Sequence, residues 1–261
     1  MTTYEITARN HSHTSENRIH SDDVAQRYGF RGGLVPGVAV FGYMTHPLVT
    51  ELGEAWLGHG ILNVRFLKPA YEGDRLHIAL ATSDATHAVT CRNDRNEVLA
   101  ELSLTTPKTL PEADARARLP APSTRPARVD ISASAIDIGV PFAPLRQTPS
   151  AEDNRTYAER VSDDLDVYRR GVLHPHLLQH WSNLALVQRF VMPAWIHVSS
   201  EMRFRRTLRV GDAVEIRAVP IEKWERKGHE FVKLYVAYVV NGEPATEVFH
   251  TAIYRVAEKA A

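Results

Sequence analysis

The chain carries one pattern twice, at an offset of 138 residues. Gly33 begins the run GLVPGVAVFGYM, and Gly171 begins GVLHPHLLQHWS. Farther along, VRFLKPAYEGD at 64–74 matches MRFRRTLRVGD at 202–212, and both copies keep the same spacing between these two blocks. Similarity that stays in register over several motifs indicates a tandem duplication. We therefore predict two copies of one structural unit.

Proline marks the segment between the copies. Eight of the fifteen prolines fall between residues 107 and 149, which predicts an extended segment without a core of its own. A chain of 261 residues can bury two cores of ordinary size. We expect an N-terminal domain at 1–106, a Pro/Ala-rich linker at 107–141 and a C-terminal domain at 142–261.

Each copy predicts one buried helix followed by long strands. Residues 34–52 are apolar on nearly every side, which indicates burial all round, and the matching helix covers about 173–190. Pro47 should kink or end the first helix unless its neighbours absorb the strain. The strands alternate between apolar and polar residues, as antiparallel sheets with one buried face do. They are expected at 4–8, 60–70, 74–83, 87–92 and 97–105, and at 143–147, 195–208, 212–222, 229–240 and 245–256.

This layout predicts an α+β fold, the double hotdog. It consists of two tandem hotdog domains, each an antiparallel sheet wrapped around a central helix. The helix start at Pro36 fits such a helix, because proline is favoured in a first turn.

Charge and cysteine content exclude several classes of function. The chain has 31 basic and 31 acidic side chains, so no net field attracts nucleic acid or an anionic membrane. A single cysteine, Cys91, excludes an internal disulfide and predicts a small core residue. The N-terminus lacks a signal pattern and no apolar run reaches about 18 residues, so we expect a cytoplasmic protein.

The stretch from residue 17 to residue 44 resembles the MaoC-like (R)-specific enoyl-CoA hydratase/dehydratase family. The residues that carry this resemblance are Asn17, Ile19, His20, Asp22, Ala25, Gly29, Phe30 and the LVPG start of the helix at 34–37. The strand at 64–74, with its Phe, Pro and Gly-Asp, is also similar to the family. The second copy matches only in its helix start and in the 202–212 strand, and it has no histidine at the place of His20.

The resemblance implies reversible addition of water to the double bond of an enoyl thioester. The substrate would be an acyl thioester of coenzyme A or of a carrier protein, with no separate cofactor. His20 would be the acid/base, and the amides of Gly37 and Val38, just after Pro36, would hold the thioester oxygen. A helix start suits that oxygen because its N–H groups are unpaired and partly positive. A homodimer is a further expectation from the fold.

One departure from the family stands just before the histidine. The family places a catalytic aspartate five residues ahead of it, whereas this chain has Ser15 there. A serine hydroxyl cannot serve as a carboxylate base at neutral pH, so Ser15 is expected to be either a functional hydroxyl of the catalytic site or a helix or turn cap. Asn17 would anchor the loop or bind a ligand oxygen. His20 itself could be a loop histidine that hydrogen bonds hold in place.

The second copy offers histidines instead of this motif. We expect His174 or His176 to line the pocket, with the others hydrogen-bonded or exposed. His176 and His180 have the spacing of metal ligands on a helix, yet no carboxylate accompanies them, so we expect no metal site.

Three basic residues are candidates for binding the phosphates of coenzyme A: Arg31, Lys68 and Arg203. For Arg203, within the run RFRR at 203–206, a solvated strand face is the alternative explanation.

Two other functions remain open from the sequence. A hotdog thioesterase would need Glu16, Asp22 or Asp23 to activate water against the thioester carbonyl. A divergent or non-catalytic acyl-binding protein would need neither carboxylate nor acid/base pair, and fold alone does not decide among these functions.

Overall fold

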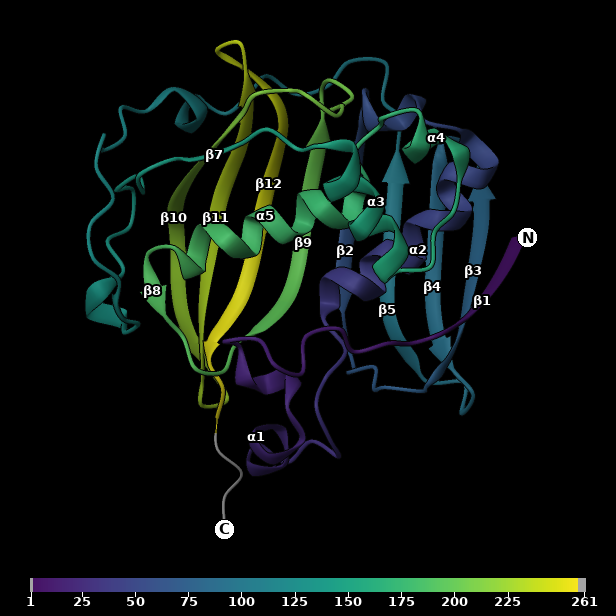
Figure 1. Cartoon of the computed structure of the whole chain (residues 1–261), viewed down its shortest axis with the longest axis horizontal. Helices are drawn as coiled ribbons and strands as arrows, with labels where there is room; N and C mark the ends of the chain where they lie inside the picture. The colour runs from purple at the N-terminus through teal and green to yellow at the C-terminus, as the bar shows by residue number, and fades with distance from the viewer. Residues whose placement is uncertain (1, 258–261) are drawn as a thin grey trace.

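A single antiparallel sheet of ten strands forms the back of the molecule (Figure 1). The computed structural model describes residues 2–257. The strand order is β1-β3-β4-β5-β2-β9-β12-β11-β10-β7. The strands are β1 Thr2–Thr7, β2 Gly60–Phe66, β3 Arg75–Ser83, β4 Thr86–Asn93, β5 Val98–Thr105, β7 Leu145–Gln147, β9 Ile196–Phe204, β10 Val214–Arg226, β11 His229–Val240 and β12 Glu243–Arg255. A separate parallel pair joins β6 Val129–Asp130 to β8 Phe190–Val191.

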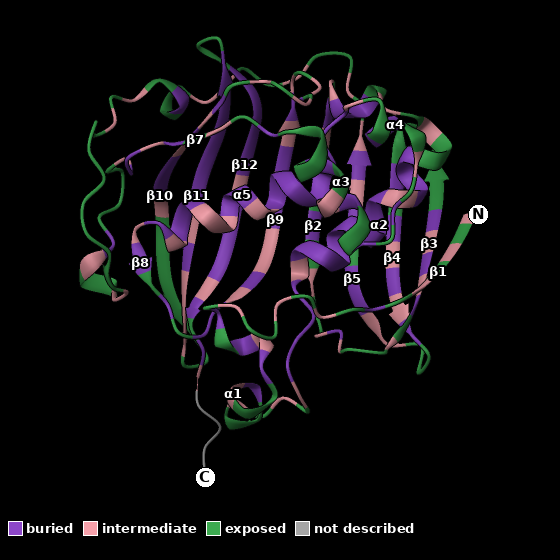
Figure 2. Ribbon diagram, viewed as in Figure 1, coloured by how far each residue is buried: buried purple, intermediate pink, exposed green. Residues whose placement is uncertain are grey.

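Two long helices, α2 and α5, cover one face of this sheet. The α-helices are α1 Asp22–Arg27, α2 Gly37–Leu52, α3 Ala151–Arg160, α4 Asp166–Arg169 and α5 Pro175–Val187. Short 3-10 turns occur at Arg18–His20, Ala55–Leu57, Ala115–Arg118 and Ala133–Ala135. Figure 2 shows long buried stretches on both α2 and α5 and on the strands behind them. Among residues 2–257, no helix is both long enough and apolar enough to cross a membrane.

The duplication in the sequence is a duplication in space. The two halves of the strand order mirror each other: the strands β1, β3, β4, β5 and β2 correspond to β7, β10, β11, β12 and β9. An isolated bridge pairs Leu34 with Tyr71, and its counterpart 138 residues later pairs Val172 with Arg209. The turn glycines that follow, Gly73 and Gly211, have φ angles of 80° and 86°. Two copies of one unit therefore lie in this sheet.

The copies meet at β2 and β9, so the sheet is continuous across the seam. Leu62 faces Met202 in this pairing, and both side chains are fully buried. In front of the seam α2 packs against α5. Gly42 permits this approach, because a Cβ there would lie 2.8 Å from a Val161 methyl and 3.2 Å from the His176 Cβ.

Helix α2 does not end at Pro47, which is the outcome expected where the neighbours of the proline absorb the strain. It continues to Leu52, and Pro47 is buried within it. Apolar contacts on nearly every side hold the chain helical on both flanks of the proline, which offsets the lost backbone hydrogen bond.

The proline-rich segment between the copies runs over the C-terminal unit (Figure 1). It buries Ala117 against a group that includes Tyr235, and it adds Ile136 to the main core. Arg128 from this segment hydrogen-bonds the Phe190 carbonyl at 2.9 Å and pairs with Glu16 of the N-terminal unit. The segment therefore ties the two units together.

Candidate functional site

A cavity of about 220 Å³ opens at the N-terminus of α2, and both copies form its wall. The first copy contributes the loop around His20, the start of α2 and the segment after β2. The second copy contributes Asn183 of α5 and the start of β9. The lining residues are Asn17, Ile19, His20, Phe30, Leu34–Gly37, Val40, Phe66–Ala70, Asn183, Trp195–Val198 and Ile253.

His20 lies in this cavity, and each of its two ring nitrogens has a hydrogen-bond partner. Its Nδ1 is 2.7 Å from the Leu34 carbonyl oxygen, and its Nε2 is 3.2 Å from Nδ2 of Asn17. A carbonyl only accepts, so Nδ1 carries the proton and donates it to Leu34, while Nε2 accepts from the Asn17 amide. Burial lowers the pKa of His20, although the Leu34 carbonyl opposes that shift. The imidazole is therefore neutral near pH 7, with its basic nitrogen on Nε2.

Asn17 clamps the His20 loop onto the second copy. Its Nδ2 donates to the Trp195 carbonyl at 3.0 Å, and its Oδ1 accepts from the Trp195 N–H at 3.0 Å. The Arg18 N–H also donates to the Pro193 carbonyl at 2.8 Å. Of the two roles expected for Asn17, the structure thus displays the anchoring one.

Ser15 does not line the cavity. Its hydroxyl donates to the Asn17 carbonyl at 3.2 Å, as in a turn. Nothing in its surroundings supports Ser15 as a stand-in for a catalytic aspartate.

The start of α2 presents free backbone donors. Pro36 is the N-cap and supplies no side-chain cap. Within residues 2–257, no acceptor receives the N–H of Gly37 or Val38. Pro36 and Gly37 line the cavity, whereas Val38 does not. The Gly37 end of the helix can therefore stabilise negative charge on a ligand oxygen.

The start of α5 is closed by the protein itself. His174 stands where Pro36 stands in the first copy, and Pro175, in the place of Gly37, has no N–H. The next amide, of His176, donates to Nδ1 of His174 at 3.0 Å. The second helix start therefore lacks the donors that α2 offers.

A buried carboxylate completes this closure. Asp163 lies 3.2 Å from Nε2 of His174 and 3.1 Å from Nδ1 of His46. Although burial raises the pKa of Asp163, the two histidines hold it well below its ordinary value. His174 and His176 are not among the cavity residues, since His174 is engaged by Asp163 and Nδ1 of His176 lies 3.2 Å from the Tyr157 carbonyl.

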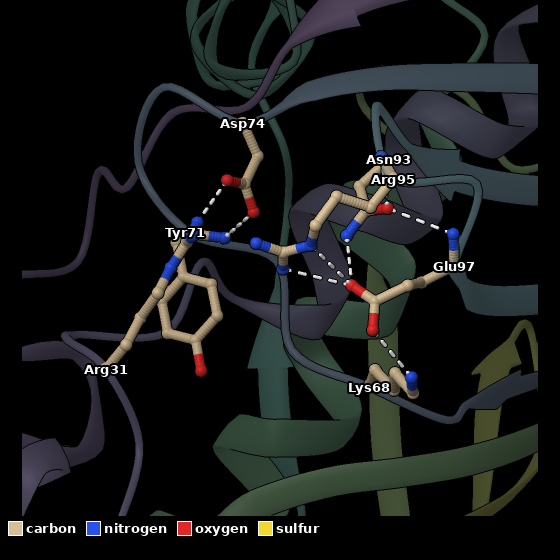
Figure 3. A network of polar contacts seen from close by, with 7 residues as sticks. All are labelled: Arg31, Lys68, Tyr71, Asp74, Asn93, Arg95 and Glu97. Atoms are coloured by element: carbon tan, nitrogen blue, oxygen red, sulfur yellow. Dashed lines mark hydrogen bonds and ion pairs between the residues drawn. The ribbon is translucent and has the colours of Figure 1, made fainter.

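The three basic candidates are all paired with carboxylates. Lys68 lines the cavity, and its Nζ is 2.8 Å from Glu97 (Figure 3). Arg31 pairs with Asp74 and lies over the Tyr71 ring, 4.1 Å from its centroid. Figure 3 shows the Lys68 and Arg31 pairs, and it shows that Glu97 also accepts hydrogen bonds from Asn93 and Arg95.

Arg203 does not line the cavity. Its Nε donates to Glu201 at 2.7 Å, and its guanidinium lies over the Phe249 ring.

None of the acidic candidates reaches the cavity. Glu16 pairs with Arg128, and Asp23 lies 3.5 Å from Arg18. Asp22 accepts the Gly33 N–H at 2.7 Å. The described lining of the cavity contains no Asp or Glu.

Sequence reasoning missed three polar residues of the cavity wall: Asn183, Trp195 and His197. All three belong to the copy that lacks the motif. The available signal was a histidine at an inward position of the strand WIHVSSEMRF, where apolar side chains would be expected.

No family model matches this chain, and no curated protein matches it. Solved structures do. A conserved Mycobacterium tuberculosis protein described as having a double hotdog fold is 13% identical, with a TM-score of 0.60 over 97% of this chain and 96% of that one. The fold is a double hotdog. The predicted α+β class and its tandem arrangement are thereby confirmed.

Other solved structures that resemble this chain are described with different activities. A candidate MaoC domain protein dehydratase from Chloroflexus aurantiacus has a TM-score of 0.60 at 14% identity, over 97% of this chain and 95% of that one. A candidate oleoyl thioesterase from Lactobacillus plantarum has a TM-score of 0.54 at 12% identity, over 99% and 98%. At such identities the likeness establishes the double hotdog fold alone, and the chemistry has to be argued from the cavity.

Proposed function

We propose that this double hotdog protein is a hydratase/dehydratase that adds or removes water on an enoyl or 3-hydroxyacyl thioester. One observation carries the proposal. A neutral imidazole, His20, and the free N–H of Gly37 line the same cavity at a helix start. A base and an oxyanion donor in one apolar cavity are the two elements that enolate chemistry needs.

The reaction can be written with His20 as the only group that moves protons. In the dehydration direction, the Asn17 N–H first releases Nε2 of His20, and Nε2 then takes a proton from the α-carbon of the 3-hydroxyacyl thioester. The C–H electron pair forms an enolate, whose oxygen the Gly37 N–H stabilises. The enolate then re-forms the carbonyl and expels the β-hydroxyl, which leaves as water with the proton from Nε2. The products are the enoyl thioester and water, and His20 is neutral again.

The backbone contact of His20 supports this role. Nδ1–H points at the Leu34 carbonyl at 2.7 Å, which fixes the ring and stabilises the imidazolium that forms during proton transfer. The same contact leaves Nε2 as the basic nitrogen of the neutral ring.

A thioesterase is the second candidate, because a structural neighbour carries that description. Its mechanism here would need Glu16, Asp22 or Asp23 as the base. Each of them is engaged with Arg128, the Gly33 amide or Arg18, and none lines the cavity. The side chains of the cavity therefore favour the hydratase.

The test is turnover of short enoyl-CoA thioesters, followed by loss of the conjugated absorbance. His20→Ala should lower kcat/KM by about 10²- to 10⁴-fold, the usual contribution of a general base. His11→Ala removes an exposed histidine of the same segment and should leave the rate unchanged. Full activity in His20→Ala would refute the acid/base role.

Release of free thiol, measured on the same samples, separates the two candidate activities. A hydratase consumes the double bond without releasing coenzyme A, whereas a thioesterase releases it. The proposed reaction uses no cofactor beyond the thioester. A homodimer and a cytoplasmic location stay predictions.

A further inference from the structure

We infer that the acyl group bound here carries an aromatic ring, joined to the thioester carbonyl through two carbons. This inference rests on the proposed thioester site and adds the class of acyl group. It concerns the part of the cavity wall where Phe66, the last residue of β2, lies next to the start of α2.

The Phe66 ring lies beside the proposed oxyanion site. Its Cε2 and Cζ atoms are 3.4 Å from the point that a Cβ on Gly37 would occupy. The ring also packs edge-on against His197, with centroids 4.8 Å apart and planes inclined by 61°. These two contacts fix the ring at the start of α2. The carbons that follow a carbonyl held by the Gly37 N–H therefore lie close to the Phe66 ring.

The second copy shows what covers the corresponding ring. Phe204, which follows Phe66 by the repeat offset, is only 1% exposed, and Trp56 packs edge-on against it with centroids 5.3 Å apart and planes at 90°. Phe66 is instead half-buried and lines the cavity. The fold thus closes one phenylalanine with an aromatic side chain and leaves its counterpart open to a ligand. An aryl group on the ligand would cover Phe66 as Trp56 covers Phe204.

Other rings lie in the same wall. Phe30 and Trp195 line the cavity together with Phe66. Aromatic rings that meet edge-on or in an offset stack gain stability beyond the area that they bury. An aryl group would gain this additional stability from the wall, whereas an alkyl chain would gain only from the buried area.

The cavity volume fits one ring and a short connection. A cavity of about 150 Å³ is enough to hold benzene. The 220 Å³ found here leaves about 70 Å³ beyond that, which at about 30 Å³ for each small group is room for two carbons. The enoyl form of such a ligand is a 3-arylacryloyl thioester, and water would add to the carbon that bears the ring.

The experiment compares the affinities of matched saturated thioesters, which the proposed reaction does not convert. The ligands 3-phenylpropionyl-CoA, 3-cyclohexylpropionyl-CoA and nonanoyl-CoA have the same number of acyl carbons and differ in the ring. Isothermal titration calorimetry should give about threefold to tenfold tighter binding of the phenyl ligand than of the cyclohexyl ligand, the effect of one aromatic pair. Nonanoyl-CoA should also bind more weakly than the phenyl ligand, because its extended chain does not fit a compact cavity.

A substitution assigns this preference to Phe66. Phe66→Leu removes the ring and keeps an apolar side chain, so the preference for phenyl over cyclohexyl should fall below about twofold. Phe231→Leu makes the same change at a half-buried phenylalanine of β11, which stacks on Trp224 and does not line the cavity. This control should keep the full preference. Thermal midpoints of both variants check folding.

The possible outcomes separate this inference from the proposed reaction. Equal affinity for the phenyl and cyclohexyl ligands, tightest binding of nonanoyl-CoA, or an unchanged preference in a folded Phe66→Leu protein would overturn the inference while leaving the hydratase proposal standing. The expected preference in a protein that turns over no enoyl thioester, cinnamoyl-CoA included, would support the inference and refute the hydratase. Failure of every thioester to bind would overturn both.

Discussion

At the residue scale, the environment of His20 sets its protonation. The ring donates to Leu34 through Nδ1 and accepts from Asn17 through Nε2. A donor placed against Nε2 favours the neutral ring, and burial acts in the same direction. The first copy therefore holds its histidine in the form that can take a proton.

This protonation predicts the pH dependence of the reaction. The base form of His20 exists above its pKa, which is lowered from 6.5. kcat/KM for dehydration should therefore rise with pH through a midpoint below 6.5 and level off at neutral pH. Asn17→Asp replaces the amide donor by an acceptor, which should raise the pKa and move the midpoint upward by about one unit.

The pH–rate profile of both proteins checks this prediction, with imidazole NMR signals as a second readout. A midpoint that does not move in a folded Asn17→Asp variant would contradict the pairing of Asn17 with His20.

The sequence predicted His20 and Gly37 in one place because both lie in a contiguous motif next to the helix start. It could not predict that Asn183, Trp195 and His197 face them, since these residues lie more than 140 positions later in the chain. Their side chains enter the cavity only through the pairing of β9 with β2 and the packing of α5 on α2. We expected His174 or His176 to line the pocket, whereas the structure engages both in contacts at the closed start of α5.

At the element scale, the two central helices start in different ways. Helix α2 leaves its first amides free, and α5 uses a proline and a histidine cap. Alternation and apolar content were enough to predict both helices and the long strands to within a few residues. Helix α3 was not predicted, although its capping box of Ser150 and Asp153 is visible in the sequence, because this polar helix buries only Asn154 and Ala158 and so carries no apolar stripe.

The close approach of Gly42 in α2 to Val161 and to α5 predicts a cost for a small substitution. Gly42→Ala would put its Cβ 2.8 Å from a Val161 methyl, and Val161 is fully buried and stiff. Overpacking costs about 1–3 kcal/mol, which exceeds the gain of at most about 1 kcal/mol from better helix propensity. The free energy of unfolding should therefore fall, as measured by urea denaturation.

Thr50→Ala, at an exposed position of the same helix, is the control and should change the free energy of unfolding by less than about 0.5 kcal/mol. A Gly42→Ala protein as stable as the parent would mean that Val161 and α5 have room to move away from α2.

At the scale of the whole molecule, one sheet carries two structural units, and only the first unit has an open helix start. The cavity at the start of α2 draws on both copies, and the corresponding helix start in the second copy is filled by His174, Asp163 and His46. We therefore predict one thioester bound per chain. Calorimetric titration with a saturated acyl-CoA should give a stoichiometry near one, and a value near two would show that the second start can open.

Buried histidines also predict acid sensitivity of the whole molecule. Burial lowers the pKa of His176, His197 and His250, the last from 6.5 to about 3. The unfolded chain therefore binds more protons below pH 6.5, and stability is lost as the pH falls from there toward the folded values. For His250 alone the loss is about 2 kcal/mol at pH 5.

Urea denaturation at pH 7, 6 and 5 measures this loss directly. The free energy of unfolding should decrease at each step, with the steeper part below pH 6. A constant value down to pH 5 would contradict the placement of these imidazoles in the interior.

The presence of both copies in one chain, paired at β2 and β9, has a consequence for how such a site can change over time. In a dimer of identical subunits, every substitution is present in both subunits. Dilution also dissociates the dimer and so separates the residues that form a shared cavity wall. In one continuous chain the second copy can accumulate replacements independently, such as a proline in place of Gly37. Its strand and helix still supply the far wall at any protein concentration, which leaves that copy free to specialise in choosing the ligand.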